Sequence, residues 1–161
     1  MAVVTLSSTK RSTVTTKGKG DAGSLKCFIN GHVTVGAADS DTSTYSFGKI
    51  PSNARIAGIS RLHYDDLATS GSPTLDIGLY AVNGNITSDV DALNDGIDAG
   101  AANGASVSIV KAKENYGKMA WEYVNGQTTD PGGELEVKVV LDDADVNAGG
   151  DMFMELYGII D

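Results

Sequence analysis

A chain of 161 residues, 41% of them apolar, is long enough for one hydrophobic core and too short for two domains. Glycine is frequent, with 20 residues, and long-chain helix formers are sparse, which favours strands joined by turns. The formal net charge is −9, so we expect neither nucleic acid nor an anionic membrane as a partner, because both carry negative charge. No stretch approaches the roughly 20 apolar residues of a membrane span. The start lacks the apolar core of a signal peptide, so we expect a cytosolic origin.

The first 23 residues differ from the rest in charge. Residues 1–20 contain Lys10, Arg11, Lys17 and Lys19 and no acid, whereas the remaining residues hold 8 bases and 21 acids. Ser, Thr, Lys and Gly dominate this segment, and its apolar run is too short to fold alone. We therefore expect an extended N-terminal arm, residues 1–23, that is disordered or ordered by a partner. Residues 24–161 are expected to form a single β-sandwich domain.

Alternation of apolar and polar residues predicts the strands of this domain. In chain order, we expect them at residues 24–30, 32–35, 42–47, 54–62, 74–82, 105–110, 119–124, 134–141 and 152–160. Asn30-Gly31 is typical of a hairpin turn between the first two. Cys27 lies in the first strand, where we expect it as a small buried side chain; as the only cysteine it has no intramolecular disulfide partner.

One segment departs from this alternation. Thr87 or Ser88 is suited to cap a short helix with acids in its first turn, and Gly96 is suited to end it. We therefore predict one short helix near residues 88–95, and a turn or one helical turn within residues 111–118. The elements together predict an all-β fold, a jelly roll or β-sandwich of about eight strands.

The sequence offers little for catalysis. His32 and His63 both lie in strand patterns, and no local nucleophile, metal-binding or phosphate-binding motif accompanies them. Residues 89–96 resemble a calcium loop, but Leu93 and Asn94 occupy the positions that require an oxygen ligand and a glycine. Asp142, Asp143 and Asp145 form a second acidic group. We expect both acidic segments to be solvated loops or to cap a helix. We therefore predict a protein that is not an enzyme, with no catalytic residue, no metal site and no cofactor.

Three motifs occur between residues 47 and 80. They are Ile50-Pro51 followed by Ala54-Arg55-Ile56, then Asp65-Asp66-Leu67, then Leu75-Asp76-Ile77-Gly78-Leu79-Tyr80. This segment resembles a family of small virion proteins of tailed bacteriophages, the head decoration or cement proteins. The likeness covers about a third of the chain.

The resemblance implies a jelly-roll-like fold and a place on the outer surface of the virion, for a protein made in the cytoplasm of a bacterial host. It implies binding to the major capsid protein, whose neighbouring subunits such proteins bridge, and it supplies no catalytic residue. Capsid proteins are commonly symmetric oligomers, so we also expect a homodimer or homotrimer. Candidate contacts with the capsid or another partner are the basic residues Lys10, Arg11, Lys17, Lys19, Arg55 and Arg61.

Two other classes of protein stay open. A carbohydrate- or receptor-binding β-sandwich domain of a phage fibre would expose an aromatic platform that includes Trp121 and Tyr123, although the strand spacing of these residues favours the core. A small phage enzyme would place His32 or His63 beside carboxylates in a cleft.

Overall fold

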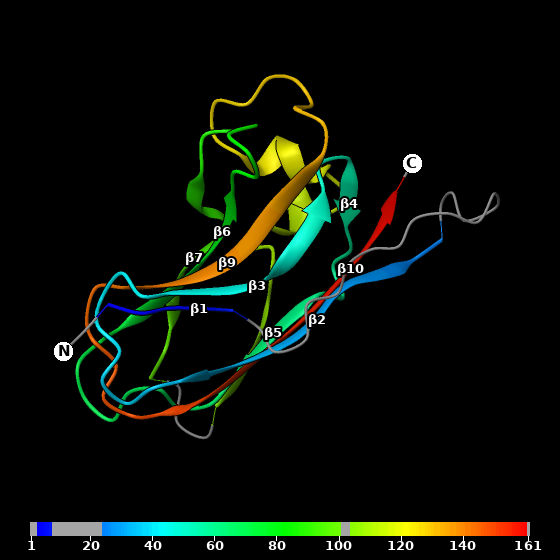
Figure 1. The fold of residues 1–161 in the computed structure, drawn as a ribbon. Coiled ribbons are helices and arrows are strands. Elements are labelled where there is room, and N and C mark those ends of the chain that lie inside the picture. The colour runs from blue at the N-terminus through cyan, green and yellow to red at the C-terminus, as the bar shows by residue number, and fades with distance from the viewer. Residues whose placement is uncertain (1–2, 8–23, 101–103, 161) are drawn as a thin grey trace.

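The structure, a computed structural model, describes residues 3–7, 24–100 and 104–160. Two β-sheets pack face to face (Figure 1). The first sheet has the strand order β1-β3-β9-β6-β7, with bounds Thr5–Ser7, Thr44–Pro51, Glu134–Asp142, Thr74–Tyr80 and Asp89–Asp98. The second sheet has the order β2-β10-β5-β8, with bounds Lys26–Val35, Gly150–Ile160, Arg61–Tyr64 and Ala105–Ser108, and β4 (Ala54–Ile56) pairs with β10 beside this path.

The topology is that of a jelly roll. Strand β2 lies in the second sheet, β3 in the first, β5 in the second, β6 and β7 in the first, β8 in the second, β9 in the first and β10 in the second. These eight strands form two four-stranded sheets, as in a double-sheet jelly roll. The predicted all-β sandwich is therefore confirmed, with ten strands in the described part of the chain because β1 and β4 add to the eight.

The core lies between the sheets and follows from the period-two alternation of the strands. In β9 and β10 every second side chain is fully buried and faces the other sheet, namely Leu135, Val137, Val139, Leu141, Met152, Met154 and Leu156. The side chains between them face outward and are polar or half-buried. These two strands match the predicted ranges 134–141 and 152–160.

The predicted hairpin at Asn30-Gly31 is wrong. β2 runs through both residues because β10 pairs with it along its length, with Gly31 opposite Met154. The prediction for Cys27 is also wrong, since this residue is exposed. The register between β2 and β10 shifts here: Ile29 pairs with Leu156 and Cys27 pairs with the next residue, Tyr157. Phe28 therefore has no paired residue in β10 and forms a β-bulge. Phe28 and Ile29 are therefore both buried, and the cysteine lies outside.

The predicted helix near residues 88–95 is wrong, because this segment is strand β7. Leu75, Ile77 and Leu79 of β6 are two residues apart, but their partners in β7 are Ile97, Asn94 and Asp89, which are three and then five residues apart. These β-bulges place extra residues in β7. Val90, Leu93 and Ile97 consequently have spacings of three and four, which imitate a helix. Gly96 has a φ of 65° within the strand and does not end a helix.

Two further segments differ from prediction. The run 54–62 is broken into β4 and β5 by a turn in which the Ser60 N–H donates to the Ala57 carbonyl over 3.0 Å. The predicted strand 119–124 is instead the 3₁₀-helix η2 (Ala120–Tyr123), where the Glu122 carboxylate accepts the Met119 N–H. The turn predicted in 111–118 contains a second 3₁₀-helix, η1 (Lys113–Asn115).

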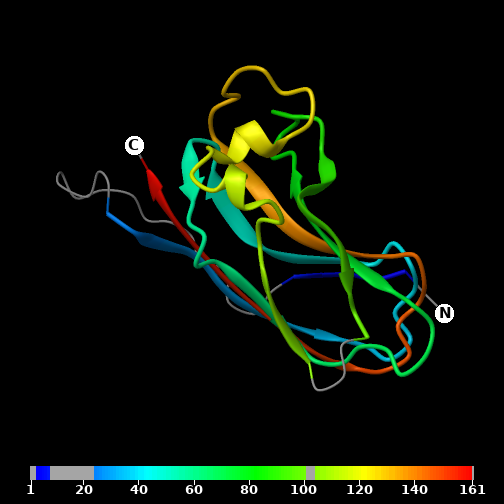
Figure 2. The same cartoon turned by 180° about the vertical axis from the view of Figure 1, so that it is seen from behind.

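Both 3₁₀-helices lie at one end of the sandwich, as the view from behind shows (Figure 2). The Trp121 N–H donates to the Ser52 carbonyl over 3.1 Å and ties η2 to the end of β3. Among the described residues, no helix has the length and apolar character needed to cross a membrane.

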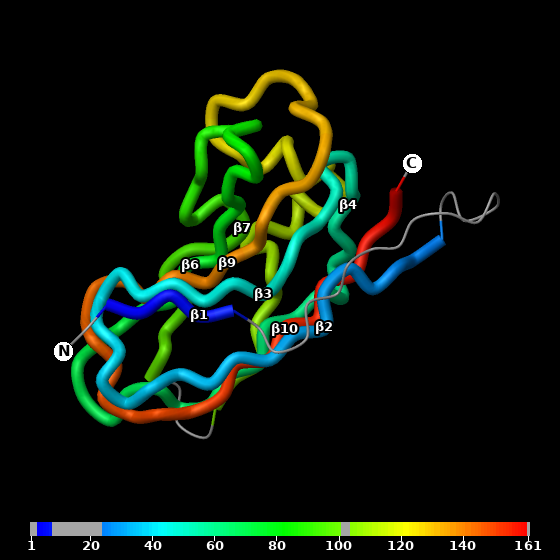
Figure 3. Tube along the Cα trace, in the orientation of Figure 1, coloured from blue at the N-terminus to red at the C-terminus, as the bar shows by residue number. Residues whose placement is uncertain are grey.

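The N-terminal segment contributes to the sandwich. Residues 5–7, which lie in the arm predicted at 1–23, form β1 at the edge of the first sheet, parallel to β3 (Figure 3). The four basic residues of the arm lie outside the described residues, so the expected division at residue 23 stays a prediction.

Two buried tyrosines connect loops to the core. The Tyr45 hydroxyl donates to Asp39 Oδ2 over 2.9 Å, and both residues are buried. Burial, and then the neighbouring Asp39 carboxylate, raise the pKa of Tyr45. The Tyr64 hydroxyl donates to the Asp98 carbonyl over 2.7 Å, so the end of β5 is joined to the end of β7.

Candidate interaction surfaces

The outer face of the second sheet carries the two predicted contact residues that the structure describes. Arg55 in β4 pairs with Ile159, and Arg61 in β5 pairs with Glu155. Both arginines are half-exposed, and the Arg55 guanidinium donates to the Gly117 carbonyl over 2.8 Å. Their partners are four residues apart on β10, so the arginines are separated by about 13 Å along this strand. They share one face of the sheet.

A row of rings crosses the middle of this face. His32 of β2 and His63 of β5 both lie opposite Phe153 of β10, and Ser106 of β8 lies opposite His63. The His63 and Phe153 rings are tilted, with centroids 6.2 Å apart. Sequence reasoning assigned neither histidine to an interaction surface. The available signal was Phe153, an aromatic residue on the polar side of an alternating strand.

Asp151 organises one side of this row. His32 Nε2 lies 3.0 Å from Asp151 Oδ1, and the Thr34 hydroxyl donates to the same oxygen over 2.7 Å. The Thr34 hydrogen bond, and then His32, lower the pKa of Asp151. The Asp151 N–H donates to Asp65 Oδ2 over 2.8 Å. Each carboxylate therefore has partners from neighbouring strands or loops that hold it in place.

A shallow hollow of about 390 Å³ opens beside this row, and His63, Asp65, Ser106, Asp151 and Phe153 contribute to its lining. The arrangement brings one histidine near two carboxylates, as the enzyme alternative requires. The carboxylate of Asp151, however, is engaged by His32, which lies on the other side of Phe153 from His63. In the described part of the chain, no hydrogen bond joins Ser106 to His63, so a relay from carboxylate through imidazole to hydroxyl is not assembled.

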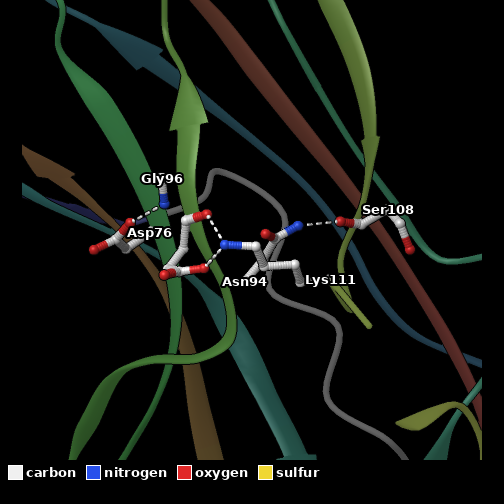
Figure 4. Close-up of polar contacts among 6 residues, drawn as sticks. Asp76, Asn94, Gly96, Ser108 and Lys111 are labelled. Atoms are coloured by element: carbon white, nitrogen blue, oxygen red, sulfur yellow. Dashed lines mark hydrogen bonds and ion pairs between the residues drawn. The ribbon is translucent and has the colours of Figure 1, made fainter. Parts of the chain in front are cut away.

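The outer face of the first sheet carries a cluster of carboxylates around β6, β7 and the end of β9. Asp76 in β6 is buried, with 8% of its surface exposed, and its Oδ1 accepts the Gly96 N–H of β7 over 2.8 Å (Figure 4). Burial raises the pKa of Asp76, the Gly96 hydrogen bond opposes this, and the carboxylates of Asp142, Asp95 and Asp143 raise it further. Each of these three carboxylates is therefore close enough to Asp76 to raise its pKa.

Cationic and amide groups tie β7 to the chain that follows β8. Lys111 Nζ contacts the Asp95 carboxylate and lies 3.2 Å from the Asp95 carbonyl. The Asn94 side-chain amide donates to the Ser108 carbonyl over 2.8 Å (Figure 4). Because Asn94 belongs to the first sheet and Ser108 to the second, their hydrogen bond joins the two sheets at this edge.

The predicted acidic segments differ in structure. Asp142, Asp143 and Asp145 lie at the end of β9 and in the loop that follows it, whereas residues 89–96 belong to β7. A hydrogen bond that Asp91 makes to the Asp89 carboxylate, followed by burial, raises the pKa of Asp91. Within the residues that the structure describes, no three histidine, cysteine or acidic side chains are grouped so as to hold a metal ion.

The aromatic residues at the η2 end form no continuous exposed platform. Trp121 and Tyr123 are half-buried and pack against the core. The Tyr123 hydroxyl donates to the Asn115 carbonyl, and Trp121 Nε1 lies 3.4 Å from the Met119 sulfur. Among the described aromatic residues, Tyr116 is the most exposed, at 38%, and its hydroxyl lies 2.9 Å from the Ser108 hydroxyl.

Solved structures share this architecture. A chain in the capsid of Ralstonia phage GP4 superposes with a TM-score of 0.67 and 20% sequence identity, over 98% of this chain and 99% of that one. This protein has the fold of a phage capsid chain. A chain in the capsid asymmetric unit of cyanophage Pam1 is also similar, with a TM-score of 0.57 and 18% identity over 92% of this chain and 94% of that one. No protein-family model and no curated protein sequence matches this chain.

Proposed function

We propose that this chain is a non-enzymatic structural protein of a bacteriophage virion, a decoration or cement protein. It binds the outer surface of the capsid and stabilises contacts between subunits of the major capsid protein. One observation carries the proposal: nearly the whole chain, 98% of it, superposes on nearly the whole of a chain from a phage capsid. The likeness therefore extends over the whole sandwich and is not limited to a few strands.

The contact surfaces of this proposal are the basic arm and the outer face of the second sheet. The arm residues Lys10, Arg11, Lys17 and Lys19 contribute +4 to a chain whose net charge is −9, so they favour an acidic partner surface. Arg55 and Arg61 lie on the outer face of the second sheet, where β10 also presents Glu155 and Phe153. Mixed charges around half-buried rings suit a protein partner better than a phosphate backbone.

Binding to capsids tests the proposal directly. Capsids assembled from the major capsid protein of the same phage, without this protein, are incubated with the purified chain and sedimented. We expect saturable co-sedimentation and a rise in the temperature at which the capsids disassemble. If the chain stays in the supernatant at every concentration tested, and the capsids are not stabilised, the proposed function is wrong.

The contacts are tested by two matched sets of charge substitutions. One set replaces Lys10, Arg11, Lys17 and Lys19 by Gln, and the other replaces Arg55 and Arg61 by Gln. Each should weaken binding and reduce its salt dependence, because charge pairs across an interface are screened by salt. Circular dichroism verifies that each variant is folded. Unchanged occupancy of capsids by both folded variants would exclude these residues as the contacts.

A further inference from the structure

The edge of the first sheet is closed by a very short strand. β1 has only three residues, Thr5–Ser7, and all of their side chains are exposed. It pairs in parallel with β3, with Thr5 opposite Thr44, Leu6 opposite Tyr45 and Ser7 opposite Ser46. Without β1, β3 would be the edge strand of this sheet, with unpaired backbone groups facing outward.

The contacts of β1 come almost entirely from backbone and hydroxyl groups. The Thr44 N–H donates to the Val4 carbonyl over 2.9 Å, and the Val4 N–H donates to the Ser43 hydroxyl over 3.1 Å. The Thr44 and Thr5 hydroxyls are 3.2 Å apart. Val4 packs partly against the core, whereas Val3 is 62% exposed and Leu6 is 36% exposed. The edge of β3 therefore recognises a short extended segment mainly through its backbone, and any copy of that segment satisfies it equally.

We propose that β1 is an exchangeable strand, which pairs with β3 of a second copy of this chain when copies are held side by side. Residues 8–23 separate β1 from the described start of the domain. A chain of this length spans up to about 50 Å when extended, which is enough to reach a neighbouring domain. The partner is thus a second copy, and the site is the outer edge of β3 from Ser43 to Ser46.

The exchange loses no contact, because the same hydrogen bonds form within one chain or between two. The choice depends on concentration. Because residues 8–23 connect β1 to its own domain, β1 meets its own β3 at an effective concentration of about 1 mM, so the strand pairs within its own chain in dilute solution. Copies arranged on an assembled surface reach comparable local concentrations, and pairing between chains then competes. Exchange of an identical element is a low-cost route to oligomers.

This inference rests on the proposal that the protein assembles with itself on a virion, and it supplies the contact for that assembly. Strand exchange would link adjacent copies through backbone hydrogen bonds, independent of which capsid surface lies below them. It also gives residues 4–7 a role distinct from the basic residues that follow them.

Disulfide trapping between separately purified variants tests the exchange. In a Cys27→Ser background, Thr5→Cys is prepared in one sample and Thr44→Cys in another, and the two are mixed and oxidised. A disulfide between these positions joins β1 of one molecule to β3 of another. We expect the heterodimer to increase as total protein rises from about 10 μM to about 1 mM, because this range approaches the effective concentration of the tether. Isotope labelling of one variant separates heterodimers from homodimers by mass.

A shifted pair is the matched control. Ser7→Cys mixed with Thr44→Cys places the cysteines two residues out of register, with Cα atoms about 8 Å apart, which is too far for a disulfide. We expect about tenfold less heterodimer from this pair than from the in-register pair. Equal yields from both pairs, or no heterodimer from the in-register pair at the highest concentration, would overturn the exchange.

The failure of the exchange can be distinguished from the failure of the proposed function. Light scattering measures the mass of the wild-type protein over the same concentrations, and sedimentation measures its binding to capsids. The oxidation is also performed on capsids that carry both variants. If the protein binds capsids but no heterodisulfide forms there or in solution, the exchange is refuted and the proposed function stands.

Discussion

Gly78 is the position where the packing of the edge strand β7 against its neighbour β6 is most directly tested. It lies in the middle of β6 and is covered by the first residues of β7. A Cβ added at this position would lie 2.5 Å from the Asp89 carbonyl oxygen, 2.5 Å from the Val90 carbonyl oxygen and 2.7 Å from the Val90 carbonyl carbon. All three atoms belong to the backbone, so no side chain can rotate away. The Gly78→Ala substitution must therefore displace β7 or β6.

Overpacking of this kind destabilises a protein by about 1–3 kcal/mol, and we expect the upper part of that range, about 2–3 kcal/mol, because the clash involves three backbone atoms. For a domain of this size each kcal/mol lowers the melting temperature by about 2–4 °C, so Gly78→Ala should lower it by about 4–12 °C. Thermal and urea unfolding measure the loss, and hydrogen exchange shows whether the amides of residues 89–98 become less protected.

Gly126→Ala is the control, because Gly126 has a φ of 77° and no neighbouring atom within 4 Å of the added Cβ. Gly126→Ala should lower the free energy of unfolding by only about 1–2 kcal/mol, the cost of a left-handed backbone conformation. It should leave hydrogen exchange in β7 unchanged. The reasoning is refuted if Gly78→Ala unfolds within about 0.5 kcal/mol of the wild type, the range of an ordinary surface substitution, or if it is destabilised without faster exchange in β7.

The tyrosine hydroxyls give two further predictions. Tyr45→Phe should lower the free energy of unfolding by about 1.5–3 kcal/mol, because the Tyr45 hydroxyl donates to the buried Asp39 carboxylate. Tyr64→Phe loses a hydrogen bond to a neutral carbonyl and should lower it by about 0.5–1.5 kcal/mol. Urea unfolding compares the two variants, and a larger loss in Tyr64→Phe would contradict the assignment. Burial raises the pKa of Tyr80 and of Tyr123 to about 12, above the unfolded value near 10, so their stabilising contribution is complete below pH 10 and is lost as the pH rises from about 10 to about 12. Unfolding free energies measured across this range should fall, and a flat profile would show that these hydroxyls are not buried.

The long regular strands were predictable because their sequences alternate without interruption. In β9, Leu135, Val137, Val139 and Leu141 occupy every second position, and the pattern gives both the strand and the buried face. The all-β class of the fold followed from such segments. Elements whose alternation is broken by extra residues were not predictable in the same way.

Strand β7 and the end of β2 illustrate this limit. The bulges in β7 arise from its pairing with β6, and the bulge that buries both Phe28 and Ile29 arises from the pairing of β2 with β10. In each case the partner strand is distant in the chain, so the local sequence contains no signal for the register. The hairpin predicted at Asn30-Gly31 was wrong for the same reason, because β2 continues to pair with β10 across these two residues.

The candidate surfaces were predicted only in part. Arg55 and Arg61 follow from the alternation of the segment that contains them, since apolar neighbours place them outward. The row of His32, Phe153 and His63 requires the adjacency of β2, β10 and β5, which are far apart in the sequence. The pairing of residues 5–7 with β3 likewise required the structure, because a three-residue strand has too little pattern to be recognised.

The distribution of charge bears on how copies of the protein can meet. The outer face of the first sheet holds Asp76 among the carboxylates of Asp142, Asp95 and Asp143, and their proximity raises the pKa of Asp76. Two such faces would repel each other, so contact between them is unfavourable at neutral pH. The edge of β3 lies beside this face and makes its contacts through backbone groups and hydroxyls, which carry no charge. Strand pairing at that edge is therefore a route by which copies with acidic faces can associate, and it accounts for a sheet edge closed by only three residues.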